Sequence, residues 1–351
     1  MHLENFRSYT KREIKFSGKV NVILGKNGCG KTNVLEAIFF LATTRSHRHA
    51  AVDELVNWAA ESFYIRAAGV ARGLSVSVEM GFGRDGTRSI KVNGKPVRQS
   101  RDVIGVLPVV MFSPEDLLLI KGDPAQRRRF LDMFISQVSP EYLSCLQKYN
   151  KVLLERNRAL QQVRDRTLGS EALDVWDENL AKPGYEIAAK RSEVIELLEK
   201  RASGTFSEVS GGQGLALKYV TAVKSEKQFL EKLREKKRIE TEIGLTTIGP
   251  HRDDLLVLAG GRNLREYGSQ GQQRVAAISL KLGQLAIMKE ALEDSPMILL
   301  DDVTSELDAE KKNRFLEFLA GDKKEEKQVF ITATAPDEFF SGHGGVNVIN
   351  L

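Results

Sequence analysis

The sequence predicts an α/β fold in which two parts of a nucleotide-binding core are separated along the chain by a helical insertion. Three observations predict it. A glycine-rich phosphate-binding loop lies near the start, between an apolar run and a helical pattern. A second apolar run far downstream ends in two aspartates, and a long helical stretch separates the two runs. Because both runs are typical of buried parallel strands, the two ends of the chain are expected to join in one sheet.

The phosphate-binding loop spans residues 25–32, whose sequence GKNGCGKT matches the pattern GxxxxGK[ST]. It follows an apolar run at 20–24 and precedes helical periodicity over 34–41. Glycines let backbone N–H groups surround the β- and γ-phosphates of a nucleoside triphosphate, and the helix start adds its positive end. Lys31 supplies a charge, and the Thr32 hydroxyl is a suitable ligand for Mg²⁺. The residues expected to bind the nucleotide are Gly25, Asn27, Gly28, Cys29, Gly30, Lys31 and Thr32.

Composition places the chain among globular proteins with a mildly basic charge balance. Of its 351 residues 42% are hydrophobic, and no apolar run reaches the roughly 18 residues of a membrane span. The polar start, residues 1–18, does not resemble a signal peptide. One of the two cysteines lies in the phosphate-binding loop, which favours a reduced, cytosolic setting. The net charge of +5 permits binding to nucleic acid without requiring it.

The first lobe, residues 1–125, is expected to be rich in strands after the loop helix. Strand patterns occur at 63–65, 74–78 and 90–92, with turn sequences at 83–86 and 93–94. A basic patch follows the loop helix and consists of Arg45, His47, Arg48 and His49. Two interpretations fit this patch: contact with nucleotide or DNA, and an ordinary solvated loop.

The insertion, residues 126–240, is expected to be helical. Apolar and aromatic residues repeat at alternating spacings of four and three between 142 and 163, interrupted by Arg156. A partner pattern over 194–198 follows a helix break expected at Pro183-Gly184. Two antiparallel helices forming a short arm fit this pattern, and so does a helical subdomain packed on the core. A strand at 215–219 and a charged helix at 232–238 complete the segment. The charged helix either presents a solvated face or contacts DNA.

Three consecutive arginines, Arg127, Arg128 and Arg129, stand at the start of the insertion. Asp123 and Asp132 flank them, so a salt-bridged helix face is one interpretation. Contact with the DNA backbone is the other.

The second lobe, residues 241–351, supplies the downstream strand at 297–300. Asp301 follows it directly and is expected to hold Mg²⁺ beside Thr32. Asp302 then lies where a carboxylate can accept a proton from the attacking water. A hairpin around 260–261 and two further strands, at 328–331 and 346–351, are also expected. His251 has no cysteine or histidine partner at ligand spacing, so a metal site there is not expected.

A second anion-binding element is expected at residues 268–274, GSQGQQR, which open a helical pattern over 275–288. Ser269 offers a hydroxyl, Gly271 and Gln272 offer accessible backbone N–H groups, and the helix start adds its positive end. Two such elements serve one nucleotide only where they face each other.

The ordered set of phosphate loop, Ser-x-Gly-Gln signature, LLDD at 299–302 and SELD at 305–308 resembles the Rad50/SMC branch of the ABC ATPases. Within that branch the chain resembles the RecF family of bacterial recombination mediators over essentially its whole length. The stretches that carry this resemblance are NFRSY at 5–9, FSPEDL at 112–117, RRRFLD at 127–132, GPHRDD at 249–254 and LDDV at 300–303.

The resemblance implies an ABC-type, Rad50-head-like ATPase with the SELD stretch as its D-loop. It also implies a head-to-tail homodimer that forms with ATP, in which Ser269 of one subunit covers the γ-phosphate held by the other. The implied DNA carries single-strand gaps or junctions between single and double strands. The implied task is to help RecA assemble there, with RecR and RecO as partners.

Two departures from the general ABC pattern suggest slow hydrolysis. Asp302 stands where a glutamate is usual, and residues 332–334, TAT, stand where a transporter ATPase has a switch histidine. Since proton transfer by a positioned group contributes about 10²–10⁴-fold, even a partial loss is large. An ATP-binding DNA scaffold with incidental turnover therefore remains an alternative. A long SMC-like DNA tether is another, which an arm reaching only about 45 Å disfavours.

Overall fold

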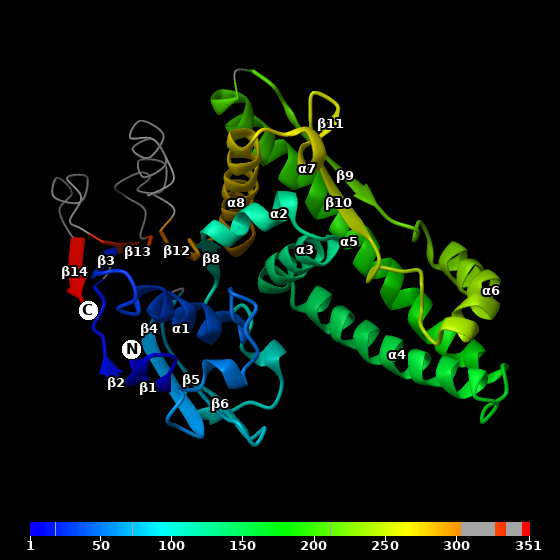
Figure 1. Ribbon diagram of the computed structural model, residues 1–351, viewed down its shortest axis with the longest axis horizontal. Helices are drawn as coiled ribbons and strands as arrows, with labels where there is room; N and C mark the ends of the chain where they lie inside the picture. Colours follow the sequence, from blue (N-terminus) through cyan, green and yellow to red (C-terminus); the bar gives the residue numbers. More distant parts are fainter. Residues whose placement is uncertain (18, 72, 211, 303–326, 335–345) are drawn as a thin grey trace. The chain divides into compact units, whose positions relative to one another are not determined.

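The computed structural model describes residues 1–351 except 18, 72, 211, 303–326 and 335–345. The chain forms two compact units. The first unit combines Met1–Asp116 with Met288–Leu351, and the second is the continuous stretch Leu117–Ile287 (Figure 1). The order of these units along the chain is the predicted order of lobe, insertion and lobe. However, residues 241–287, which include the signature stretch and were predicted in the second lobe, belong to the second unit. The assignment of three functional segments therefore remains a prediction.

A five-stranded parallel sheet forms one part of the first unit, in the order β14-β3-β13-β12-β8. Its strands are β3 (Val20–Leu24), β8 (Val109–Phe112), β12 (Met297–Leu300), β13 (Val329–Ala333) and β14 (Val346–Asn350). All four pairings are parallel. The expectation that the two ends of the chain share one sheet is confirmed, because β3 pairs with β13 and β14.

A six-stranded antiparallel sheet forms the rest of this unit, in the order β2-β1-β4-β5-β6-β7. Its strands are β1 (His2–Phe6), β2 (Tyr9–Glu13), β4 (Ser62–Ala71), β5 (Leu74–Gly83), β6 (Arg88–Val92) and β7 (Lys95–Pro96). Helix α1 (Lys31–Thr43) contacts strands of both sheets, and the apolar residues of all three share one core. Two 3₁₀ turns, η1 (Asp53–Leu55) and η2 (Ser100–Asp102), lie in the connections.

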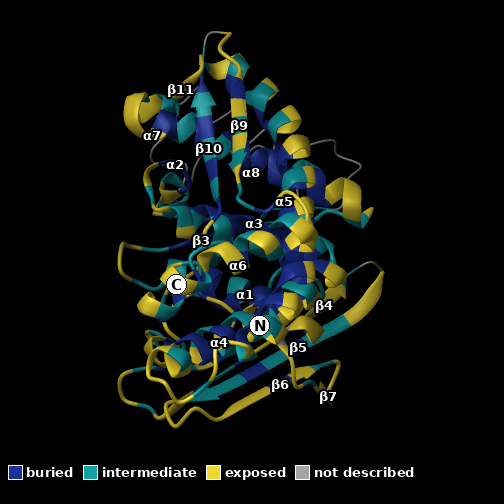
Figure 2. Ribbon diagram, turned by 90° about the vertical axis from the view of Figure 1, so that its right-hand side faces the viewer, coloured by how far each residue is buried: buried dark blue, intermediate teal, exposed yellow. Residues whose placement is uncertain are grey.

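The second unit begins with a short 3₁₀ turn and a series of helices. These are η3 (Pro114–Leu117, which begins in the first unit), α2 (Leu118–Lys121), α3 (Pro124–Val138), α4 (Pro140–Arg164), α5 (Ala172–Val209) and α6 (Glu226–Ile243). Helices α4 and α5 pack against each other, and α6 contacts both. Tyr142 bonds to Arg191 whereas Arg156, further along α4, bonds to Asp177, nearer the start of α5, so the predicted pair of antiparallel helices is confirmed. Buried and exposed positions alternate along α5 (Figure 2). Arg156, the interruption in the apolar stripe, is fully buried and ion-paired with Asp177 and Glu240.

The remainder of this unit contains β9 (Leu215–Val220), β10 (Asp254–Ala259) and β11 (Arg262–Asn263). After them come α7 (Leu264–Tyr267) and α8 (Gln270–Leu292, whose last residues belong to the first unit). The predicted strand at 215–219 and the hairpin at Gly260-Gly261 are confirmed.

The predicted helix break at Pro183-Gly184 is wrong, because both residues lie inside α5. The predicted D-loop, residues 305–308, lies outside the described residues. No helix among the described ranges is long and apolar enough to cross a membrane.

Candidate nucleotide-binding site

The phosphate-binding loop connects the end of β3 to the first residue of α1, as predicted. Gly30 adopts a left-handed conformation with φ of 103°, which favours glycine at this position. The Lys31 ammonium donates to the carbonyl oxygens of Gly25 at 2.7 Å and Lys26 at 3.0 Å, so its charge is held against the loop.

The turn between β1 and β2 supports the start of α1. The Tyr9 hydroxyl donates to the Gly30 carbonyl at 3.2 Å, and the Asn33 amide donates to the Ser8 hydroxyl at 2.9 Å. A side chain at position 30 would collide with Tyr9, which is a second reason for glycine there. The predicted loop geometry thus depends on residues that precede it by about twenty positions.

A buried carboxylate extends this support by one further helical turn. Glu36 is fully buried and receives two hydrogen bonds from the Arg7 guanidinium, both at 2.8 Å, and one from the Ser46 hydroxyl. Burial works to raise the pKa of Glu36, but the bonds from Arg7 and Ser46 outweigh it, so the pKa lies below its ordinary value. Glu36 is therefore ionised at neutral pH and fixes α1 to the β1–β2 turn.

The predicted magnesium ligands meet at the carboxyl edge of the parallel sheet. The Thr32 hydroxyl donates to a carboxylate oxygen of Asp301 at 2.9 Å. The Thr332 hydroxyl, from the neighbouring strand β13, lies 2.9 Å from the same oxygen. Burial raises the pKa of Asp301, and these two hydroxyl groups oppose the rise. Two oxygen donors at a strand end fit the ligand preference of Mg²⁺.

Asp302 follows Asp301 in a left-handed backbone conformation, with φ of 51°. Its backbone N–H donates to the Thr332 hydroxyl at 3.0 Å. Thr332, the first residue of the stretch that replaces the switch histidine, thus contacts both aspartates. The proton-accepting role of Asp302 remains a prediction.

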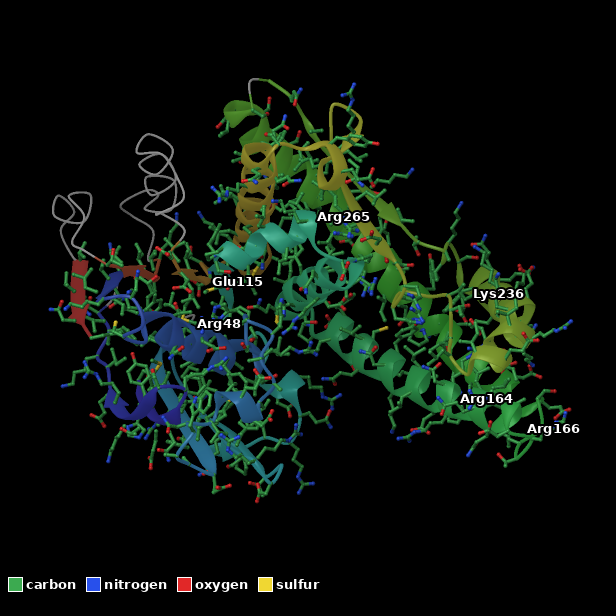
Figure 3. The ribbon with its side chains drawn as sticks, in the orientation of Figure 1. Arg48, Glu115, Arg164, Arg166, Lys236 and Arg265 are labelled. Atoms are coloured by element: carbon green, nitrogen blue, oxygen red, sulfur yellow. The ribbon has the colours of Figure 1, made fainter. Side chains whose placement is uncertain are left out.

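Sequence reasoning assigned no role to Glu115, which follows the buried strand β8. One of its carboxylate oxygens is shielded from solvent and has no hydrogen-bond partner among the described residues. Glu115 acts electrostatically on Asp301 and on His47, and Arg48 acts on the same two residues. Figure 3 labels Glu115 and Arg48. Burial lowers the pKa of His47 to about 4, so this imidazole is neutral. The sequence feature that could have identified Glu115 is its place as an acidic residue shortly after a fully apolar strand.

The signature stretch forms a reciprocal cap at the start of α8. The Gln272 backbone N–H donates to the Ser269 hydroxyl at 3.2 Å, and the Ser269 N–H donates to the Gln272 side-chain oxygen at 2.9 Å. Gly271 has no heavy atom closer than 4.0 Å to the position of an added side chain. The predicted helix start is confirmed, while its contact with a nucleotide remains a prediction.

The three consecutive arginines have different environments in α3. Arg127 is buried and ion-paired with Asp254 at 2.7 Å, so its predicted contact with DNA is wrong and its partner is neither flanking aspartate. Arg128 is half-buried and donates to the Asp253 carbonyl at 2.7 Å. Arg129 is half-buried and also has an interaction partner. For Arg128 and Arg129, DNA contact stays a prediction.

Comparison with known proteins gives consistent results. The family model for the RecF/RecN/SMC N terminal domain matches residues 1–349. The DNA replication and repair protein RecF of Agathobacter rectalis is 38% identical over 97% of this chain and 92% of its own length. That of Halalkalibacterium halodurans is 42% identical over 95% of this chain and 92% of its own length.

Solved structures show the same similarity. The recombination mediator RecF-ATP of the RecFOR pathway has a TM-score of 0.90 at 35% identity, covering 96% of this chain and 91% of that one. An Smc head bound to the C-winged helix domain of ScpA has a TM-score of 0.54 at 17% identity, covering 98% and 91%. The second likeness concerns the fold alone.

Proposed function

This chain belongs to the RecF family, and we propose that it acts as an ATP-dependent DNA-binding protein of recombinational repair. The observation that carries the proposal is the hydrogen bond between Thr32 and Asp301, which joins the phosphate-loop helix to the strand that follows it far downstream in the chain. A loop with this partner is suited to a nucleoside triphosphate and its metal ion, not to a phosphate group alone.

The residues of the site have distinct roles in this proposal. Lys31 and the loop N–H groups bind the phosphates, and Thr32 with Asp301 would hold Mg²⁺. The ion, when bound, neutralises charge on the β- and γ-phosphates. Asp302 accepts a proton from the attacking water. Because its carboxylate is one methylene shorter than that of glutamate, hydrolysis is slow and suits a timed switch.

The switch itself is an ATP-induced homodimer. Ser269 of one copy covers the γ-phosphate bound by the other, and the cap that fixes Ser269 on α8 keeps its hydroxyl at the helix start. Loss of the γ-phosphate then removes the contact that joins the copies. We place this cycle on gapped or junction DNA, where the protein helps RecA to load together with RecR and RecO.

The first test is the molar mass in solution with and without ATP–Mg²⁺. The native chain should be a monomer without nucleotide and a dimer with it, while Ser269→Arg should remain monomeric. Ser225→Arg is a matched control, because Ser225 caps α6 in the same way and has no part in the proposed interface. An unchanged mass of the native chain with ATP would refute the composite site.

Asp302→Asn separates the switch from its alternative. This variant should bind ATP normally and dimerise, but its dimer should persist because hydrolysis is slowed. Lys31→Ala should lose nucleotide binding altogether. If Asp302→Asn dissociates as fast as the native protein, the role of Asp302 is wrong and a DNA scaffold with incidental turnover becomes the better account.

A further inference from the structure

One tryptophan of the first unit is almost completely exposed. Trp58 presents 97% of its surface to solvent, more than any other large hydrophobic side chain among the described residues. A tryptophan buries about 150–250 Å² when covered, and it is highly buried on average. Because this side chain is exposed, its burial contributes no hydrophobic free energy to the folding of the monomer.

The turn that presents Trp58 is held by hydrogen bonds on both sides. The Ala60 N–H donates to the Asn57 carbonyl at 3.0 Å, and the Ala59 N–H donates to the Asn57 side chain at 3.1 Å. The Asn57 amide donates to the Arg7 carbonyl at 2.7 Å. These bonds pin the residue that precedes Trp58 to the β1–β2 turn.

Arg84 clamps the other side of the turn. Its guanidinium donates to the carbonyl oxygens of Ala60 at 3.2 Å and Val56 at 3.4 Å. Val56 itself is buried and bridges to Phe6. Since the backbone is fixed on both sides of the indole, little conformational entropy is lost when a partner covers it.

The charges around Trp58 indicate the kind of partner. Asp53, Glu54 and Glu61 are exposed and lie within five residues of it. The two arginines that touch the turn are already occupied, Arg84 with carbonyl groups and Arg7 with Glu36. An apolar anchor with carboxylates beside it repels phosphate groups, and it complements an apolar pocket with lysine or arginine at its rim.

We propose that Trp58 is the anchor of a protein–protein contact, in which the indole enters an apolar, basic-rimmed pocket of another protein of the RecFOR pathway. This inference rests on the proposed function for the choice of pathway. Tryptophan is enriched among the residues that dominate binding energy at interfaces, and a rigid, solvent-facing indole meets that requirement.

The test uses the fluorescence of Trp58. The chain has two tryptophans, so Trp176→Phe leaves Trp58 as the sole reporter. Purified RecR and RecO are added separately to this full-length variant, and a labelled junction DNA is added in a third titration. One of the two proteins should shift the emission to the blue with saturation, whereas DNA alone should leave it unchanged.

Substitutions then measure the contribution of the indole. Trp58→Ala should weaken binding of that protein about 30-fold, as expected for truncating a dominant interface residue. Trp58→Phe should weaken it less. Leu74→Ala is a matched control, because Leu74 is 71% exposed in the same unit and should have no effect.

Three results would overturn the proposal. If RecR or RecO binds, as seen by molar mass, without changing Trp58 emission or the affinity of Trp58→Ala, the contact lies elsewhere and the proposed function stands. If DNA alone shifts the emission, Trp58 stacks on bases instead. If neither protein binds at all, the partners named in the proposed function are wrong as well.

Discussion

The pair Arg7–Glu36 shows how one residue can control the position of a helix. Glu36 is fully buried, and Arg7 supplies two of its hydrogen bonds. Arg7→Ala would leave a buried carboxylate without its charge partner, so it should lower the free energy of unfolding by about 3–5 kcal/mol. ATP affinity should fall as well, because α1 carries Thr32. Urea unfolding and ATP titration measure the two effects.

Two variants check this interpretation. Arg7→Lys keeps the charge but not the paired geometry, and it should lie between the native protein and Arg7→Ala. Arg12→Ala is the control, because Arg12 is exposed and bonds only to a backbone carbonyl in the described contacts. Equal losses for Arg7→Ala and Arg12→Ala would contradict the buried ion pair.

His251 should make the second unit sensitive to acid. Its ring nitrogens lie 2.7 Å from the Tyr149 hydroxyl and 3.1 Å from the Thr246 carbonyl oxygen, and burial lowers its pKa to about 4. Because the unfolded chain binds this proton near pH 6.5, stability should fall as the pH drops from about 6.5 to about 4. Between pH 7 and pH 5 the loss should be about 2 kcal/mol.

His251→Gln tests this sign directly. The glutamine amide does not titrate, so the variant should lose about 2 kcal/mol less than the native protein between pH 7 and pH 5. Its stability at pH 7 is expected to be lower, since the geometry with Tyr149 changes. Urea unfolding at several pH values provides the slopes. Identical slopes for both proteins would show that His251 is accessible to protons in the native state.

Single residues also mark the limit of prediction from sequence. Thr32 and Asp301 were identified correctly as neighbours, because a local motif and a strand end define them. The contact between Arg7 and Glu36 was not predicted, because the spacing of two residues in the sequence does not indicate that a turn and a helix touch. Arg127 forms an ion pair, which was one of the two interpretations, but its partner Asp254 was not predicted because it is distant in sequence.

At the scale of elements, two glycines in one helix should respond in opposite ways to the same change. A methyl group at Gly184 in α5 would overlap the ring of Phe229 and press on Tyr149, whereas at Gly204 it would meet no atom within 4 Å. Gly184→Ala should therefore destabilise the protein by about 1–3 kcal/mol. Gly204→Ala should stabilise it by about 0.5–1 kcal/mol through helix propensity. Thermal unfolding compares the stabilities of the two variants. If both variants were more stable than the native protein, the close contact between Gly184 and Phe229 would be contradicted.

The continuity of α5 has the same origin. A proline in a helix removes one backbone hydrogen bond, and this local rule predicted a break at Pro183. Packing outweighs this local preference. Because Gly184 has no side chain, the Phe229 ring of α6 can lie against α5, and Pro183, Leu180 and Ile187 are all buried. Strands and helices with strong periodicity were predicted correctly, and the failure occurred where tertiary contacts outweigh local preference.

At the scale of the whole molecule, the two compact units are expected to respond separately to nucleotide. The phosphate loop and Asp301 belong to the first unit, while α4 and α5 belong to the second. In the Ser269→Arg background, which removes the proposed contact between copies, ATP–Mg²⁺ should stabilise only the unit that binds it. At 100 times the dissociation constant this stabilisation is about 2.7 kcal/mol.

Amide hydrogen exchange distinguishes the units without separating them. The slowest amides of β3, β12 and α1 should exchange about 100-fold more slowly with ATP–Mg²⁺, whereas those of α4 and α5 should not change. Lys31→Ala in the same background should abolish the difference. If protection spreads equally to α4 and α5, the units unfold together, and nucleotide binding in the first unit is coupled to the helical arm within a single copy. In that case dimerisation is not needed to transmit the presence of ATP to the arm.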